Sequence, residues 1–255
     1  MPFVVHAVPC LADNYAYLIH DQTTGATAVI DVPEAAPVQQ ALAAQGWTLG
    51  DILITHHHSD HIDGVDALRA ATGAKVRGAR ADAHRLPPLD HALSDGDSFS
   101  IGSETCTVLD VSGHTLGHVA FHFPESRLAF TADSLMALGC GRLFEGTPAQ
   151  MWDSLTKLMD LPADTVICSG HDYIKGNAAF AQTVDGDNPD LQARIARSRM
   201  DRAEGRPMAI APLALELATN PFLRAGDPGM KAALGMAQAS DAEVFAHLRA
   251  LKDRF

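Results

Sequence analysis

Short apolar runs recur along roughly the first 170 residues, and turn-forming or polar residues bound each of them. These runs predict strands at residues 3–8, 15–20, 27–31, 52–54, 97–101, 105–111, 119–123, 128–131 and 165–168. Longer segments with helical spacing predict helices at residues 35–45, 62–71 and 147–160. Strands interspersed with helices predict an α/β (α+β) fold for this part of the chain.

The pattern changes near residue 172. The segments 178–183, 189–204 and 241–252 predict helices, and runs of β-branched residues become rare. Asn188 followed by Pro189 is a favourable helix start, because asparagine caps a helix and proline suits its first turn. We therefore predict two domains, an α/β domain at residues 1–172 and an all-helical domain at residues 173–255.

The composition fits a globular enzyme and restricts its partners. The 255 residues are 47% hydrophobic, enough for one large core and a smaller appended domain, and the net charge is −12. This acidic balance argues against nucleic acid or an anionic membrane as a partner. No apolar stretch reaches membrane-spanning length, the first residues lack the features of a secretory signal, and the four cysteines form no CxxC pair. We expect a cytoplasmic protein that is a monomer.

The strongest chemical signal is the segment 55–64, which follows a predicted strand. It contains His56, His58, Asp60 and His61. Neutral imidazole and carboxylate groups are ligands for zinc, iron and manganese. His56 and His58 are two residues apart, so an extended backbone directs both side chains to one side. The segment therefore predicts ligands for two neighbouring metal ions.

This His-x-His-x-Asp-His pattern resembles the signature of the metallo-β-lactamase superfamily. There the first two histidines bind one metal, and the Asp-His pair binds the second. The resemblance implies further ligands downstream, and three candidates each follow a predicted strand: His114, Asp133 and His171. It assigns three ligands to each metal and one to both: His56, His58 and His114; Asp60, His61 and His171; and the bridging Asp133.

Such ligand sets leave an open position, so a water or hydroxide can also bridge the two ions. Two metal ions lower the pKa of that water and polarise a substrate carbonyl, which is catalytic rather than structural chemistry. The ligand types do not select the metal; we expect two divalent ions, zinc first, with iron or manganese also suitable. Asp60 and Asp133 are the predicted catalytic carboxylates, and Asp60 would orient the hydroxide or carry its proton.

Further motifs resemble glyoxalase II, the hydroxyacylglutathione hydrolases of that superfamily. They lie at residues 11–19, 139–146, 170–177, 188–194, 219–224 and 249–253, so the resemblance covers essentially the whole chain. It implies a four-layer αββα sandwich of two mixed sheets, followed by a helical domain that binds glutathione. The implied reaction is hydrolysis of S-(2-hydroxyacyl)glutathione thioesters by the bridging hydroxide. The chief substrate would be S-D-lactoylglutathione, which yields D-lactate and glutathione in methylglyoxal detoxification.

The same resemblance implies a set of glutathione contacts: Arg142, Tyr173, Asn177, Arg249 and Lys252. Arg249 and Lys252 are three residues apart, so on a helix they share a face and can bind a carboxylate together. Without the resemblance, two basic residues near a helix end are more often solvated partners of the helix dipole. Phe144 stands where some relatives have tyrosine, so any contact made by that hydroxyl is absent.

Two questions stay open at this level. Asp31 ends a predicted strand near the edge of the site, where it either holds a ligand histidine by a hydrogen bond or caps a turn. For the activity, the alternatives are a persulfide dioxygenase that uses a single iron, another thioester hydrolase of the superfamily, and a metal-binding protein without turnover.

Overall fold

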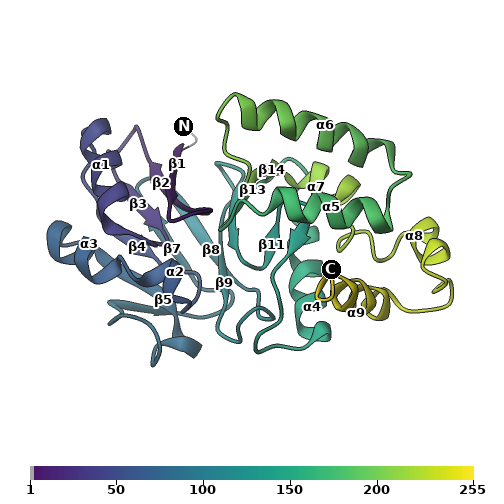
Figure 1. Ribbon diagram of the computed structural model, residues 1–255. Helices are drawn as coiled ribbons and strands as arrows, with labels where there is room; N and C mark the ends of the chain where they lie inside the picture. Colours follow the sequence, from purple (N-terminus) through teal and green to yellow (C-terminus); the bar gives the residue numbers. More distant parts are fainter. Residues whose placement is uncertain (1–2) are drawn as a thin grey trace.

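The computed structural model describes residues 3–255, in which two six-stranded sheets lie face to face between layers of helices (Figure 1). The first sheet has the order β1 (Val4–Cys10), β2 (Asn14–His20), β3 (Thr27–Ile30), β4 (Asp51–Leu53), β5 (Lys75–Ala79) and β6 (His91–Leu93). The second has the order β14 (Ile210–Pro212), β13 (Val166–Ser169), β10 (Leu128–Ala132), β9 (Val119–Phe123), β8 (Glu104–Asp110) and β7 (Ser98–Ile101). A two-stranded ribbon pairs β11 (Leu135–Met136) with β12 (Gly139–Cys140). The expected four-layer sandwich is confirmed.

Apolar side chains on the facing sides of the two sheets form one core. Tyr17 and Leu53 of the first sheet pack with Phe121 and Phe130 of the second, and all four are almost fully buried. Because successive strand residues point to opposite faces, Ile52 packs instead among the residues beneath the outer helices. Strands that end near the site are therefore held on both faces.

Helices cover the outer faces of both sheets (Figure 1). α1 (Ala35–Gln45) and α3 (Val65–Thr72) pack on the first sheet, and α4 (Pro148–Met159) packs on the second. α4 begins as predicted, because the Thr147 side chain accepts a hydrogen bond from the Gln150 backbone and the Gln150 side chain accepts one from the Thr147 backbone. This capping box fixes where the helix starts.

The segment after the predicted metal motif differs from the prediction. One helix over residues 62–71 is wrong, because α2 (Ser59–Ile62) ends before α3 begins. The chain turns at Gly64, where a Cβ would lie 2.6 Å from the backbone nitrogen of Ala35. Only glycine allows this close approach to α1. The break leaves the Asp-His pair of the motif on a short helix of its own.

Helices make up most of the chain after residue 172: α5 (Ile174–Val184), α6 (Pro189–Ala203), α7 (Leu213–Thr219), α8 (Pro228–Ala233) and α9 (Asp241–Lys252). The sequence analysis misses β14, which joins the second sheet beside β13. Pro212 is tolerated there because β14 is an edge strand. Phe245 of α9 packs with Met151 of α4, so this segment shares a core with the sandwich. Within residues 3–255, no helix has both the length and the apolar character needed to cross a membrane.

The strand directions bring several loops to one edge of the sandwich. β8, β10 and β13 run the same way, because β8 and β10 are antiparallel to β9 and β13 is parallel to β10. The segments that follow these strands therefore meet. The loop after β4 joins them through a backbone hydrogen bond from Val119 to Thr55 (2.9 Å), and β2 joins through one from Tyr15 to Gly170 (2.9 Å).

Candidate active site

The seven predicted metal ligands lie close together at this edge. They come from the loop after β4, from α2, and from the segments after β8, β10 and β13: His56 and His58; Asp60 and His61; His114; Asp133; and His171. Three groups of three residues have one ligand atom from each residue within 4.8 Å of the others, and two of these groups consist only of predicted ligands: His56, His58 and His114, and Asp60, His61 and His171. We call these the first and the second triplet; they are the groups that the family resemblance implies.

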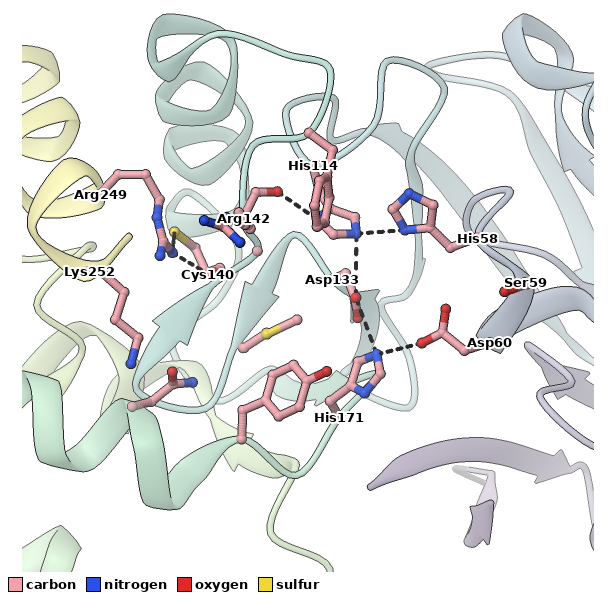
Figure 2. A pocket seen from close by; sticks show the side chains of 15 residues that line it. His58, Ser59, Asp60, His114, Asp133, Cys140, Arg142, His171, Arg249 and Lys252 are labelled. Atoms are coloured by element: carbon pink, nitrogen blue, oxygen red, sulfur yellow. Dashed lines mark hydrogen bonds and ion pairs between the residues drawn. The ribbon is translucent and has the colours of Figure 1, made fainter. Parts of the chain in front are cut away.

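Asp133 lies between the two triplets (Figure 2). Its Oδ1 is 3.6 Å from Nε2 of His61, and its Oδ2 is 3.5 Å from Nε2 of His114 and 3.3 Å from Nε2 of His171. The buried Oδ1 has no hydrogen-bond partner among the described residues. A buried carboxylate oxygen without a partner is costly unless a cation takes it up.

Ring nitrogens within each triplet point at one another. Nδ1 of His58 lies 3.2 Å from Nε2 of His56 and 3.0 Å from Nε2 of His114. Nε2 of His61 lies 3.3 Å from Nε2 of His171. Hydrogen bonds do not satisfy all these contacts, because a neutral imidazole has a single N–H donor. Converging lone pairs and the partnerless oxygen of Asp133 therefore fit divalent metal ions.

Asp31 forms hydrogen bonds that orient residues of this cluster. Its Oδ2 is 2.8 Å from Nδ1 of His61, and its two oxygens accept hydrogen bonds of 2.8 Å from the backbone and the hydroxyl of Thr55. The Thr55 hydroxyl is in turn 3.0 Å from Nδ1 of His56. These contacts favour a ring proton on each outer nitrogen, which leaves the inner nitrogens free for a metal. Two roles were left open for Asp31, and the geometry favours the hydrogen bond to a ligand histidine over the capping of a turn.

Two further histidines are held in the same way. Nδ1 of His114 lies 2.7 Å from the backbone oxygen of Arg142, and Nδ1 of His171 lies 3.0 Å from Oδ1 of Asp13. The sequence analysis does not predict the contact of Asp13. The outer bonds orient both rings toward the cluster.

Burial and charge divide the cluster into two electrostatic halves. Burial lowers the pKa of His56 well below its ordinary value and that of His58 to about 4, so both rings stay neutral. Burial also opposes protonation of His61 and His171. Asp133 and the neighbouring carboxylates outweigh it and raise these pKa values to about 10 and about 11. The second triplet thus attracts positive charge, and a divalent cation there would displace the ring protons.

A cavity of about 540 Å³ opens beside the cluster (Figure 2). One wall carries side chains of the metal-ligand type: His58, Asp60, His114, Asp133 and His171. We call this the ligand wall. The other wall carries all five predicted substrate contacts: Arg142, Tyr173, Asn177, Arg249 and Lys252. We call this the cationic wall.

Comparisons with known proteins agree with this arrangement. The metallo-beta-lactamase superfamily matches residues 12–171, and the hydroxyacylglutathione hydrolase C-terminus matches residues 172–255. A hydroxyacylglutathione hydrolase from Cereibacter sphaeroides is 62% identical over the whole of both chains, and one from Jannaschia sp. is 64% identical over 97% of each. The chain belongs to the hydroxyacylglutathione hydrolase family.

A solved structure supports the fold of this hydroxyacylglutathione hydrolase family member. ETHE1 from Myxococcus xanthus is 27% identical with a TM-score of 0.67, and the match covers 98% of this chain and 90% of that one. The two hydroxyacylglutathione hydrolases are more than twice as similar in sequence and cover 97% or more of the chain. The persulfide dioxygenase alternative is therefore not favoured.

The two basic residues at the end of α9 already have partners in this hydroxyacylglutathione hydrolase fold. Arg249 is buried and donates a hydrogen bond to the backbone oxygen of Cys140 at 3.0 Å. Lys252 donates to the backbone oxygen of Gly176 at 2.9 Å. Arg142, by contrast, has a side chain that is 60% exposed. The cationic wall therefore combines one buried, hydrogen-bonded guanidinium with one that is largely exposed.

Tyr173 and Asn177 differ in how freely they face the cavity. The Tyr173 ring stacks on His171 with centroids 4.5 Å apart and is partly exposed. Burial raises the pKa of its hydroxyl above the ordinary value, so it remains a hydrogen-bond donor. Asn177 is buried, and its amide donates to the backbone oxygen of Ala137 at 3.0 Å. Asn177 thus also holds the turn between β11 and β12.

Sequence reasoning also missed Asn14 and His118. Asn14, the first residue of β2, donates to Oδ2 of Asp60 at 3.1 Å. His118 stacks on His56 with centroids 4.6 Å apart, and its Nε2 accepts a hydrogen bond from the backbone of Asp133 at 3.3 Å. Asn14 belongs to one of the family motifs, which is a signal for its importance. The alternation of polar and apolar residues around His118 is that of an ordinary strand, so it does not reveal a contact with the predicted ligands.

Proposed function

We propose that this chain hydrolyses S-(2-hydroxyacyl)glutathione thioesters, chiefly S-D-lactoylglutathione, to the hydroxy acid and glutathione. The observation that carries the proposal is one cavity that joins the ligand wall to the cationic wall (Figure 2). In such a thioester the glutathione part has two carboxylates for the cations, and the acyl part brings the thioester carbonyl to the ligand wall. The whole-chain relatives bear the name of this activity.

The two triplets and Asp133 would hold two divalent cations, for which we expect zinc. Histidine and aspartate also bind iron and manganese, so availability decides which metal is present. When bound, such a pair supplies a water of lowered pKa and polarises a carbonyl oxygen. Asp31 and Asp13 keep the histidine rings in the orientation that binding requires.

Asp60 is the residue that we assign to the attacking water. Its carboxylate lines the cavity and is held by Asn14 at 3.1 Å. The hydrogen bond with His171 holds the pKa of Asp60 well below its usual range. The carboxylate therefore stays ionised, accepts a hydrogen bond from the water and directs it at the thioester carbon. The departing thiolate is a good leaving group, so it needs little help from a general acid.

The cationic wall would bind the glutathione part. Arg249 and Lys252 come from the last turn of α9 and can take up a carboxylate. Tyr173 can donate a hydrogen bond to the peptide backbone of glutathione. We assign residues 1–172 to metal binding and residues 173–255 to glutathione binding. We expect a monomer in the cytoplasm, and the four buried free cysteines agree with a reducing compartment.

The test is hydrolysis of S-D-lactoylglutathione by the metal-loaded protein, followed by the loss of thioester absorbance. In Lys252→Ala we expect KM to rise about tenfold with kcat little changed, because the lost charge acts on ground-state and transition-state binding alike. Lys75→Ala removes an exposed lysine of β5 and serves as the control. A protein that holds two metal ions and leaves the thioester intact would contradict the proposal.

A further inference from the structure

Asp253 joins the two guanidinium groups of the cationic wall. One of its oxygens lies 3.2 Å from Nε and 2.9 Å from Nη2 of Arg249, and 3.7 Å from Nε of Arg142. Both arginines line the cavity beside Cys140, whereas Asp253 is not among the lining residues (Figure 2). The Asp253 carboxylate therefore lies outside the cavity lining but contacts the same two guanidinium groups that a substrate carboxylate would meet.

Local structure does not account for an acid at this position. Asp253 is the C-cap of α9, where the helix dipole disfavours negative charge. It also follows Arg249 by four residues, and this order of base and acid is the less favourable one along a helix. Its contacts with the cavity cations are what distinguish it.

The hydrogen bonds of Arg249 leave room for a ligand. A guanidinium has five N–H donors. Asp253 takes one from Nε and one from Nη2, and Nη1 donates one to the backbone oxygen of Cys140 and one to its Sγ at 3.8 Å. One donor, on Nη2, remains. Arg249 also lies over the ring of Phe222 at 5.2 Å, so several contacts besides Asp253 fix its orientation.

We propose that Asp253 limits the affinity of the cationic wall for the carboxylate of glutathione. This inference rests on the proposed function. A ligand carboxylate on the free donor of Arg249 binds the same guanidinium as Asp253 and is repelled by its like charge. At this distance and in partly solvated surroundings, the repulsion corresponds to about threefold to tenfold in affinity. Asp253 thereby weakens the hold on the glutathione that hydrolysis releases.

The test compares Asp253→Asn with Asp253→Ala in the metal-loaded protein. Asparagine keeps the acceptor oxygen and removes the charge. We expect KM for S-D-lactoylglutathione and the inhibition constant of glutathione both to fall about threefold to tenfold in Asp253→Asn, and less in high salt. Asp253→Ala also removes the acceptor that orients Arg249, so its affinity should be lower than that of Asp253→Asn.

Asp164→Asn is the matched control. It makes the same change in net charge, and Asp164 pairs with Arg127 before β13, where both side chains are more than half exposed. Its KM should equal that of the wild type. An unchanged or raised KM in Asp253→Asn, with wild-type turnover intact, would overturn this inference alone. Absence of wild-type turnover would instead refute the proposed function.

Discussion

The two walls of the cavity are built on different principles. The ligand wall follows strands that are packed on both faces, and the neighbouring ligands His56 and His61 are fully buried with their outer nitrogens bonded. The charged side chains of the cationic wall are long and come from α9 and from the loop after β12, and Arg142 is largely exposed. Reactive groups need close positional control, whereas charge acts at longer range. Changes to the ligand wall should therefore alter metal content and kcat, and changes to the cationic wall should alter KM.

The largest effect is expected at Asp133, which contacts histidines of both triplets. In Asp133→Ala we expect kcat to fall at least about 1000-fold, because the developing charge loses the metal ions that would stabilise it. Metal content per chain, measured by mass spectrometry, should fall below two. Asp153→Ala, an exposed change on α4, is the control. Two bound metals with full turnover in Asp133→Ala would show that the bridging assignment is wrong.

A second change to the ligand wall should act on the metal while sparing the fully loaded enzyme. Asp31→Asn weakens the hydrogen bond that orients His61. We expect about 10- to 100-fold weaker metal binding in a competition with a chelator. With excess metal, kcat should largely recover. Asp63→Asn lies two residues after His61 but is exposed, and its metal affinity should match the wild type. Equal losses in both variants would assign the effect to the loop as a whole.

A smaller effect is expected at Glu145, which lies three residues after Arg142 in the loop after β12. Its carboxylate accepts a hydrogen bond from the backbone of Leu116 at 2.8 Å and pairs with Arg85, which also pairs with Asp82. The Arg85 contact holds the pKa of Glu145 at about 2, below its ordinary 4.5. The stabilisation is therefore present above the ordinary pKa and is lost as the pH falls toward 2.

In Glu145→Gln the loop that carries Arg142 should loosen. We expect KM to rise about threefold while kcat changes little, since the ion pair is partly exposed and its contribution is modest. Glu125→Gln, at the exposed turn between β9 and β10, is the control. A loss of kcat at unchanged KM would place Glu145 with the ligand wall instead.

The sequence predicted the metal-ligand side chains more completely than the residues that position them. Residue type and spacing are enough to find the segment 55–64, because few other functions bring those side chains together. The residues that position the site, such as Asp13 and Glu145, lie within the family motifs at residues 11–19 and 139–146. Their partners are far away in the chain, so the motifs do not show what they contact. The fold shows the same division. α9 has a long periodic sequence and was found. β5, β6 and β14 were missed, because they are short and, unlike β4, do not follow from a continuous run of large apolar residues.

The smallest effect is expected at Phe144, whose ring stands edge-on to His58 and His114 at 5.6 and 5.3 Å but is 62% exposed. Phe144→Tyr adds the hydroxyl that some relatives carry here. Because an exposed hydroxyl exchanges one hydrogen bond to water for one to glutathione, KM should fall only about twofold to threefold, with kcat unchanged. Phe144→Leu keeps an apolar contact without a ring and should not lower KM. A change in kcat in Phe144→Tyr would mean that the ring acts on the histidines it touches, and Phe144 would then belong to the ligand wall.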